Sequence, residues 1–106
     1  MARSKWNNTV CYLYCITHKK SKKKYIGLTS DPTQRWSDHV ILALDKGTKK
    51  KYPIHKAIQR GGVKNFTFGI LCSGSRSIMS HVEVAMIAHW KTRVPKGYNV
   101  TPGGEM

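Results

Sequence analysis

Two apolar stretches decide the fold, VCYLYCIT at residues 10–17 and KYIGLT at residues 24–29, with the polar run HKKSKK between them. Two such stretches flanking a short polar segment predict a β-hairpin. The polar run lacks the Asn-Gly or Asp-Gly pair that is typical of a two-residue turn, so we expect a longer loop. If that loop holds an even number of residues, Tyr14 and Tyr25 lie on one face of the sheet, because successive strand residues point to opposite faces.

The rest of the chain carries helical and strand patterns in turn. Asp31 followed by Pro32 offers a helix N-cap, and this helix is predicted to run to Gly47. The remaining predicted elements are a short helix at 53–61, a strand at 66–70, a turn at 73–77 and a last helix at 78–91. The order β-β-α-α-β-α predicts an α+β domain, a small three-stranded antiparallel sheet flanked by helices.

Length and composition bound the class of protein. The 106 residues suit one compact domain, which we assign to residues 10–106, after a basic N-terminal segment at residues 1–9. No apolar run approaches the roughly 20 residues that cross a bilayer, and the start lacks the apolar stretch of a secretory signal. We therefore expect a cytoplasmic protein with no membrane partner. The odd set of three cysteines, with no CxxC pair, predicts neither a disulfide framework nor a zinc site.

Charge indicates the partner. Nineteen lysines and arginines face five acids, a formal net charge of +14. Nucleic acid is the partner we expect, since each neutralised phosphate releases counterions and adds affinity without sequence preference. A merely solubilising surface and an anionic membrane remain alternatives. The residues expected to contact the nucleic-acid backbone are Lys22, Lys23, Lys24, Lys49, Lys50 and Lys51.

Several side chains suggest chemistry, each with a structural alternative. Arg35 and His39 are four residues apart on the predicted helix, so they share a face, which could simply be solvated. Glu83 lies among apolar residues of the last helix. A carboxylate in such surroundings usually has a cation partner, either an Arg or Lys of this basic chain or a divalent metal. The two hairpin tyrosines could pack across strands or act in a site.

Taken in order, these residues resemble the GIY-YIG nuclease family. The landmarks are Tyr12-Leu13-Tyr14, Tyr25-Ile26-Gly27, Thr29, Arg35-Trp36 with His39, Asn65-Phe66, Glu83, and Gly97-Tyr98-Asn99 followed by Thr101-Pro102-Gly103-Gly104. The resemblance covers nearly the whole chain, from about Val10 to Glu105. The main departure is Tyr12, a bulky residue in place of glycine, which we expect to alter packing at the strand edge or to narrow the substrate groove.

The resemblance implies the same α+β fold and hydrolysis of DNA phosphodiester bonds with Mg²⁺ or Mn²⁺. It assigns catalytic roles to Tyr14, Tyr25, Arg35, His39, Glu83 and Asn99. Tyr14 would be the base or proton relay, for which nearby cations would have to favour the ionised phenol. Arg35 would stabilise the phosphate charge, and Glu83 would bind the metal. The family also implies a further His or Tyr, for which the sequence does not decide between Tyr52 and His55.

The expected substrate is double-stranded DNA, and the expected state is a monomer or weak dimer, with any separate DNA-recognition domain outside this chain. A phage or other mobile element is one genetic setting that the resemblance suggests. Two rival functions stay open at this point. One is a non-catalytic nucleic-acid-binding domain on the same fold, and the other is a basic structural protein.

Overall fold

A computed structural model describes residues 10–46 and 51–103. The elements in chain order are β1 (Val10–His18), β2 (Lys24–Thr29), α2 (Pro32–Leu44), α3 (Pro53–Gly61), the 3₁₀ turn η1 (Val63–Asn65), β3 (Phe66–Ser75) and α4 (Arg76–Trp90). The strands form one antiparallel sheet in the order β2-β1-β3. The α+β class and the β-β-α-α-β-α order predicted from the sequence are confirmed.

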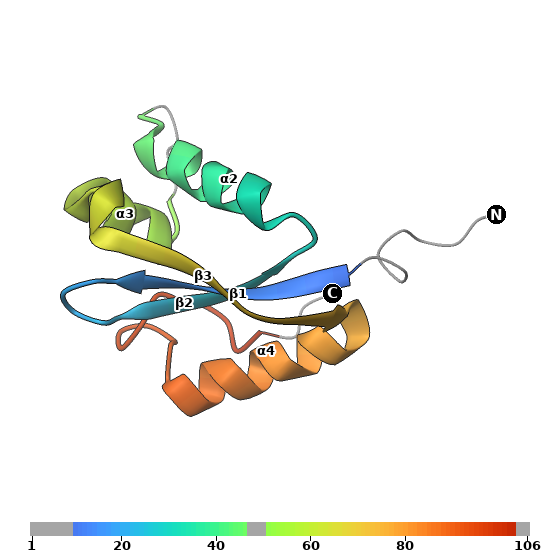
Figure 1. The fold of residues 1–106 in the computed structure, drawn as a ribbon. Helices are drawn as coiled ribbons and strands as arrows, with labels where there is room; N and C mark the ends of the chain where they lie inside the picture. The colour runs from blue at the N-terminus through green and yellow to red at the C-terminus, as the bar shows by residue number, and fades with distance from the viewer. Residues whose placement is uncertain (1–9, 47–50, 104–106) are drawn as a thin grey trace.

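The sheet lies between two helical layers. Figure 1 shows α2 and α3 on one face and α4 on the other. Alternate residues of β1 point to opposite faces of the sheet, and β1 carries apolar residues at both sets of positions. One set (Cys11, Leu13, Cys15) packs toward Met79 and Ile87 of α4, and the other (Tyr14, Ile16) packs with Ala43, Ile54 and Ile58. Helices on opposite faces therefore bury separate halves of the core.

The hairpin register brings the two tyrosines to one face. Ile16 is paired with Tyr25, and Tyr14 with Gly27, so Tyr14 and Tyr25 share the α2–α3 side. The loop is longer than two residues, as expected. It closes on His18, whose Nδ1 accepts the backbone N–H groups of two loop residues at 3.2 and 3.0 Å.

The N-cap predicted for α2 is confirmed, since the Asp31 side chain accepts the backbone N–H of Gln34 at 3.1 Å. The helix ends at Leu44, earlier than predicted, and Gly47 lies outside the described residues.

The turn predicted at 73–77 is wrong. β3 continues to Ser75, because residues 73–75 pair with the first residues of β1 and so gain strand hydrogen bonds that local sequence does not reveal. α4 then begins directly at Arg76, two residues before the predicted start, with the Ser75 side chain accepting the Ile78 N–H at 3.3 Å. At its other end the helix stops at Trp90, where Lys91 adopts a left-handed cap.

No helix in the described part of the chain is long and apolar enough to span a membrane. Cys11, Cys15 and Cys72 are free thiols, the first two inside the core and the third exposed.

Candidate active site

Four side chains form a continuous hydrogen-bonded chain on the α2–α3 face of the sheet. The Arg35 Nε–H donates to the Tyr14 hydroxyl at 3.3 Å, and that hydroxyl lies 2.8 Å from Nε2 of His39. The second ring nitrogen of His39, Nδ1, lies 3.0 Å from Nε2 of His55. The chain thus connects β1, α2 and α3, and three residues expected to act together, Tyr14, Arg35 and His39, are in direct contact.

His55 is the member that the sequence left unassigned. It is buried on the same short helix as Ile54 and Ile58, where an imidazole among apolar neighbours needs a hydrogen-bond partner. That partner is His39. In the sequence, the position of His55 close to two apolar residues of the same helix was the only indication that it is buried. Its partner ring becomes known only from the packing of α3 against α2.

The glycine of the second triplet makes room for Tyr14. A Cβ atom added to Gly27 would lie 2.4 Å from the Tyr14 hydroxyl oxygen and 2.5 Å from Cζ of the same ring. The tyrosine ring therefore crosses directly over the paired residue of β2. Only glycine permits this approach, which carries the hydroxyl to His39.

Burial keeps both histidines neutral. Desolvation, followed by repulsion from the Arg35 guanidinium, lowers the pKa of His39 to about 3. The same two causes, with Lys51 as a third, lower the pKa of His55. At neutral pH each ring consequently has one nitrogen that can accept a proton and one that can donate.

Burial also keeps Tyr14 protonated. Desolvation and the nearby Tyr25 raise the pKa of Tyr14 well above its ordinary value, although Arg35 acts in the opposite direction. The expectation that cations favour an ionised Tyr14 is therefore wrong for this site, because one guanidinium does not offset burial. Tyr14 begins as a phenol hydrogen-bonded to a neutral imidazole.

The hydrogen-bonded chain opens into a pocket of about 520 Å³. Its walls include Arg35, His39 and His55 on one side and Tyr25 with the segment 98–101 on the other. The Tyr25 ring centroid lies 5.4 Å from that of His39. A phosphate bound in this pocket would meet the Arg35 guanidinium and Tyr25. Tyr14 is 1% exposed and does not line the pocket, and its hydroxyl is connected to it through Arg35 and His39, which do.

Glu83 lies in the helical layer on the opposite face of the sheet (Figure 1) and does not line the pocket. It lies half-buried in α4, on the helix stripe of Met79 and Ile87. Its carboxylate is one cause of the raised pKa of Tyr25, after burial and the opposing effect of Arg35, so the two groups are electrostatically coupled across the edge of β2. Gly103 packs over it, since an added Cβ there would lie 3.3 Å from Glu83 Cδ.

This environment fits a divalent metal held largely by water and substrate. Within residues 10–46 and 51–103 no three His, Cys, Asp or Glu side chains gather as a ligand set, so Glu83 would be a single protein ligand. Mg²⁺ commonly keeps several waters and binds through one or two carboxylates plus substrate phosphates.

Asn99 holds the backbone of β2. Its amide oxygen accepts from the Ile26 N–H at 2.9 Å and from the Thr92 hydroxyl at 2.7 Å, and its Nδ2 donates to the Ile26 carbonyl at 2.9 Å. The residue is buried and clamps the C-terminal segment to the strand that carries Tyr25. Its amide is hydrogen-bonded within the protein, and the residue also forms part of the pocket wall.

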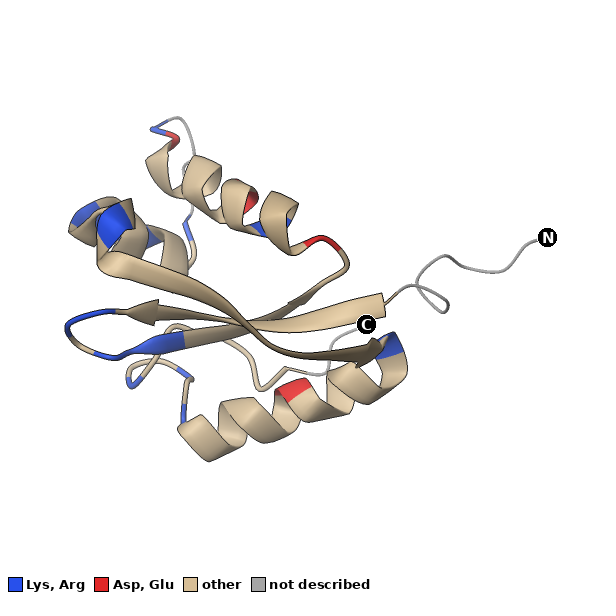
Figure 2. Cartoon of the chain, viewed as in Figure 1, with Lys and Arg blue, Asp and Glu red and all other residues tan. Residues whose placement is uncertain are grey.

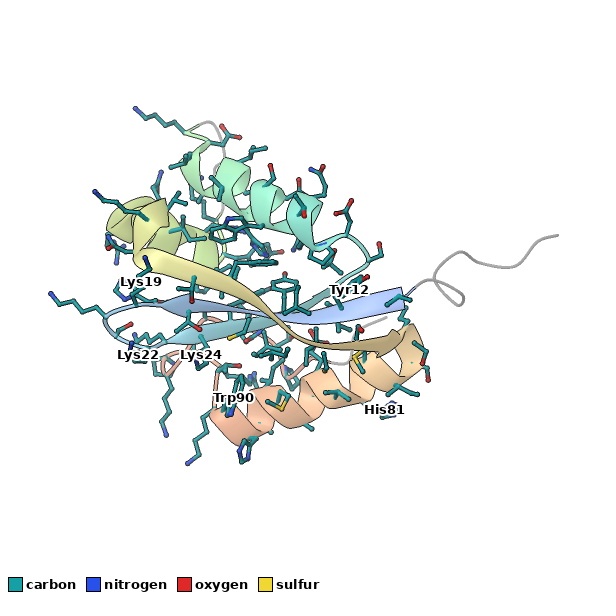
Figure 3. All side chains as sticks on the ribbon, in the orientation of Figure 1. Tyr12, Lys19, Lys22, Lys24, His81 and Trp90 are labelled. Carbon is teal, nitrogen blue, oxygen red and sulfur yellow. The ribbon has the colours of Figure 1, made fainter. Side chains whose placement is uncertain are left out.

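Tyr12 lies away from the pocket. β1 is the central strand, so Tyr12 is not at a sheet edge, and it is absent from the pocket walls. Figure 3 places it at the end of β1 opposite the hairpin loop. Tyr12 therefore does not narrow this pocket, and its effect on a bound substrate stays a prediction.

The lysines singled out from the sequence divide into two groups. Lys22 and Lys23 are exposed in the hairpin loop. Lys24 is half-buried, donates to the Thr17 hydroxyl at 3.1 Å and lies over the Trp90 ring, and Lys51 donates to two backbone carbonyls. Lys49 and Lys50 lie outside the described residues.

Comparison with known proteins agrees with this geometry. A family model described as the GIY-YIG catalytic domain matches residues 10–98. The fold is similar to that of the catalytic domain of the intron endonuclease I-TevI, solved as a mutant, with a TM-score of 0.75 and 20% sequence identity over 89% of this chain and 96% of that one. No curated protein sequence matches the chain. Because the family model spans most of its length, the chain belongs to the GIY-YIG family of nuclease catalytic domains.

Proposed function

We propose that this nuclease domain is a DNA endonuclease that cuts double-stranded DNA with Mg²⁺ or Mn²⁺. The observation that carries the proposal is the hydrogen-bonded chain from Tyr14 through His39 to His55, which opens beside Arg35 into the pocket. Hydrolysis of a phosphodiester needs a group that takes a proton from the attacking water and a positive group for the extra phosphate charge. The site offers both.

The chain of rings provides a proton path that balances. Water attacks phosphorus and gives its proton to the Tyr14 oxygen, while the Tyr14 proton moves to Nε2 of His39 and the His39 Nδ1 proton moves to Nε2 of His55. The P–O3′ bond breaks as the new P–O bond forms, and the departing 3′-oxygen takes a proton from solvent to become a hydroxyl. His55 lines the pocket, so the proton it receives can pass on to solvent. Tyr14 does not have to be ionised before the reaction in this scheme. The raised pKa of its phenol is therefore compatible with its role as a proton relay.

Arg35 has two tasks in this scheme. Its Nε–H holds the Tyr14 oxygen, and the rest of the planar guanidinium can bind the phosphate whose negative charge grows during attack. Tyr25, in the wall of the same pocket, would orient the water and the phosphate. Asn99 would act as a positioning residue through its hold on β2.

Glu83 would hold the metal ion. An ion bound there would supply Lewis-acid stabilisation of the phosphate and leaving oxygens. The support for this assignment is the half-buried carboxylate on an apolar helix face, coupled to Tyr25 and covered by a glycine.

The similar fold of an intron endonuclease favours a mobile-element or phage setting inside a cell. With one such site per chain, a monomer would nick one strand, and cutting both would need a weak dimer or two visits.

The test is nicking of supercoiled plasmid by wild type, Glu83→Ala and the control His81→Ala, which alters an exposed residue of the same helix. We expect wild type and the control to nick with Mg²⁺ and not with EDTA. Glu83→Ala should bind a duplex almost normally and fail to cut. Nicking by Glu83→Ala at the wild-type rate removes the metal assignment. Tight binding with no cutting in Mg²⁺ or Mn²⁺ by any form favours the non-catalytic alternative.

A further inference from the structure

Three segments far apart in the sequence bring exposed cations to one end of the molecule, here called the basic pole. Figure 2 shows this concentration of lysine and arginine at the hairpin end, on α3 and after α4. The exposed members are Lys19, Lys20, Lys22 and Lys23 in the hairpin loop, Lys56, Arg60 and Lys64 in α3 and η1, and Lys91, Arg93 and Lys96 after α4.

Backbone contacts hold these segments side by side. The Lys19 N–H donates to the Asn65 carbonyl at 2.9 Å, which joins the hairpin loop to η1. The Tyr98 N–H donates to the Lys24 carbonyl at 2.9 Å, which joins the C-terminal segment to β2. Lys24 also lies over Trp90, and Figure 3 shows both residues near this end. The pole is therefore a property of the folded domain and not of one lysine-rich run.

The described segments that form the basic pole contain no carboxylate. Residues 18–24, 56–65 and 91–97 contain neither Asp nor Glu. The carboxylates that the structure describes are Asp31, Asp38, Asp45 and Glu83, on or beside α2 and within α4. Gathering like charges costs free energy through mutual repulsion, which a polyanionic partner would relieve.

The pole borders the candidate active site along two elements. α3 presents His55 to the pocket and carries Lys56 and Arg60 further along. The C-terminal segment lines the pocket at 98–101, and Arg93 is tied to it by a hydrogen bond to the Val100 carbonyl at 3.2 Å. A duplex seated in the pocket can thus extend onto the pole in one direction.

We infer that the basic pole docks the phosphate backbone of duplex DNA on one side of the scissile bond, an inference that rests on the proposed function. His18 lies four residue steps along β1 from Tyr14, about 13 Å at 3.3 Å per residue. At 3.4 Å per base pair this is about four base pairs, and the loop extends further. The contacts should therefore lie about four to six base pairs from the cut, without sequence preference.

The test measures affinity by fluorescence anisotropy in EDTA, so that no cutting occurs. A triple variant, Lys20→Gln with Lys23→Gln and Lys96→Gln, is compared with wild type and with Lys46→Gln, an exposed lysine outside the pole. We expect the slope of log affinity against log salt to fall by about one for each cation removed in the triple variant and to stay unchanged in the control.

Duplexes with a mapped cleavage position then test the direction. Shortening the DNA to three base pairs from the cut should weaken binding several-fold on one side only, and the triple variant should lose this asymmetry. Equal effects on both sides, or equal slopes in all three proteins, overturn the inference, as does stronger attraction to anionic vesicles than to DNA.

The two proposals fail separately. If the triple variant cuts plasmid and binds DNA like wild type, the docking role of the basic pole is contradicted and the proposed nuclease activity is supported. If the triple variant binds DNA more weakly and no form of the protein cuts, the proposed endonuclease activity is contradicted. The role of the basic pole in binding nucleic acid is then still supported.

Discussion

The most revealing single change is Gly27→Ala, because it places one methyl group against the hydroxyl at the centre of the proposed chemistry. The added Cβ would lie 2.4 Å from Oη, 2.5 Å from Cζ and 2.9 Å from Cε2 of Tyr14. That ring is 1% exposed and packed against Phe68 at a centroid distance of 5.0 Å. It has little freedom to rotate away.

The geometry sets the size of the expected effect. Ordinary contact begins near 3.4 Å, so the end of the ring must retreat by about 1 Å. The hydroxyl now lies 2.8 Å from His39, and such a displacement would stretch or tilt this bond beyond useful range. Misplacement of a reacting group by 1 Å can cost about 100-fold in rate. Overpacking should also cost about 1 to 3 kcal/mol of stability.

The assay is single-turnover nicking of supercoiled plasmid at saturating protein and 20 °C, with folding verified by circular dichroism. Gly69→Ala is the matched control, since a Cβ at this β3 position meets no atom within 4 Å. We expect about a 100-fold slower step for Gly27→Ala and a wild-type rate for Gly69→Ala. A folded Gly27→Ala protein that nicks within threefold of wild type would refute the reasoning about Tyr14.

Three further changes test other parts of the site. His39 is buried and neutral, with its pKa lowered to about 3. Below pH 6.5 the unfolded chain therefore binds a proton at this residue that the folded chain does not. The free energy of unfolding consequently falls as the pH falls. Between pH 7.5 and 4.5 wild type should lose about 3 kcal/mol more than His39→Gln in urea unfolding, and equal losses would contradict this. The control His89→Gln, on an exposed residue, should follow wild type. Gly103→Ala adds a methyl group 2.9 Å from Ile87 Cδ1 and 3.3 Å from Glu83 Cδ, at a φ of +88°. It should lower stability and raise the Mg²⁺ concentration for half-maximal nicking several-fold, without changing duplex affinity in EDTA. An unchanged Mg²⁺ dependence of nicking would show that Gly103 does not affect metal binding. Asn99→Ala should cost about 2 to 3 kcal/mol, because it leaves buried β2 backbone groups unpaired, and a wild-type unfolding midpoint would show that water replaces the amide.

Local patterns were sufficient for much of the fold. Apolar alternation predicted the hairpin, and Asp31 before Pro32 marked the start of α2, because capping and strand periodicity act over a few residues. The ordered landmarks from Tyr14 to Asn99 indicated the family, which the family model confirms. The excess of positive charge likewise needs only the composition.

What local patterns missed depends on partners distant in the chain. Residues 73–75 resemble a turn, yet pairing with β1 makes them strand. The position of His55 beside His39 depends on how two helices pack, and sixteen residues separate them.

The sequence alone determined which residue types are available: tyrosines, one helical arginine–histidine pair, a single carboxylate in the last helix and a surplus of lysine. Only the tertiary structure decided their chemical state and which of them meet. Burial turns Tyr14 into a persistent phenol and His39 into a neutral acceptor, and folding separates Lys24, engaged with Trp90, from the exposed cations of the pole. The physical reason is that desolvation and hydrogen bonding depend on the three-dimensional surroundings of a group, which no short stretch of sequence contains.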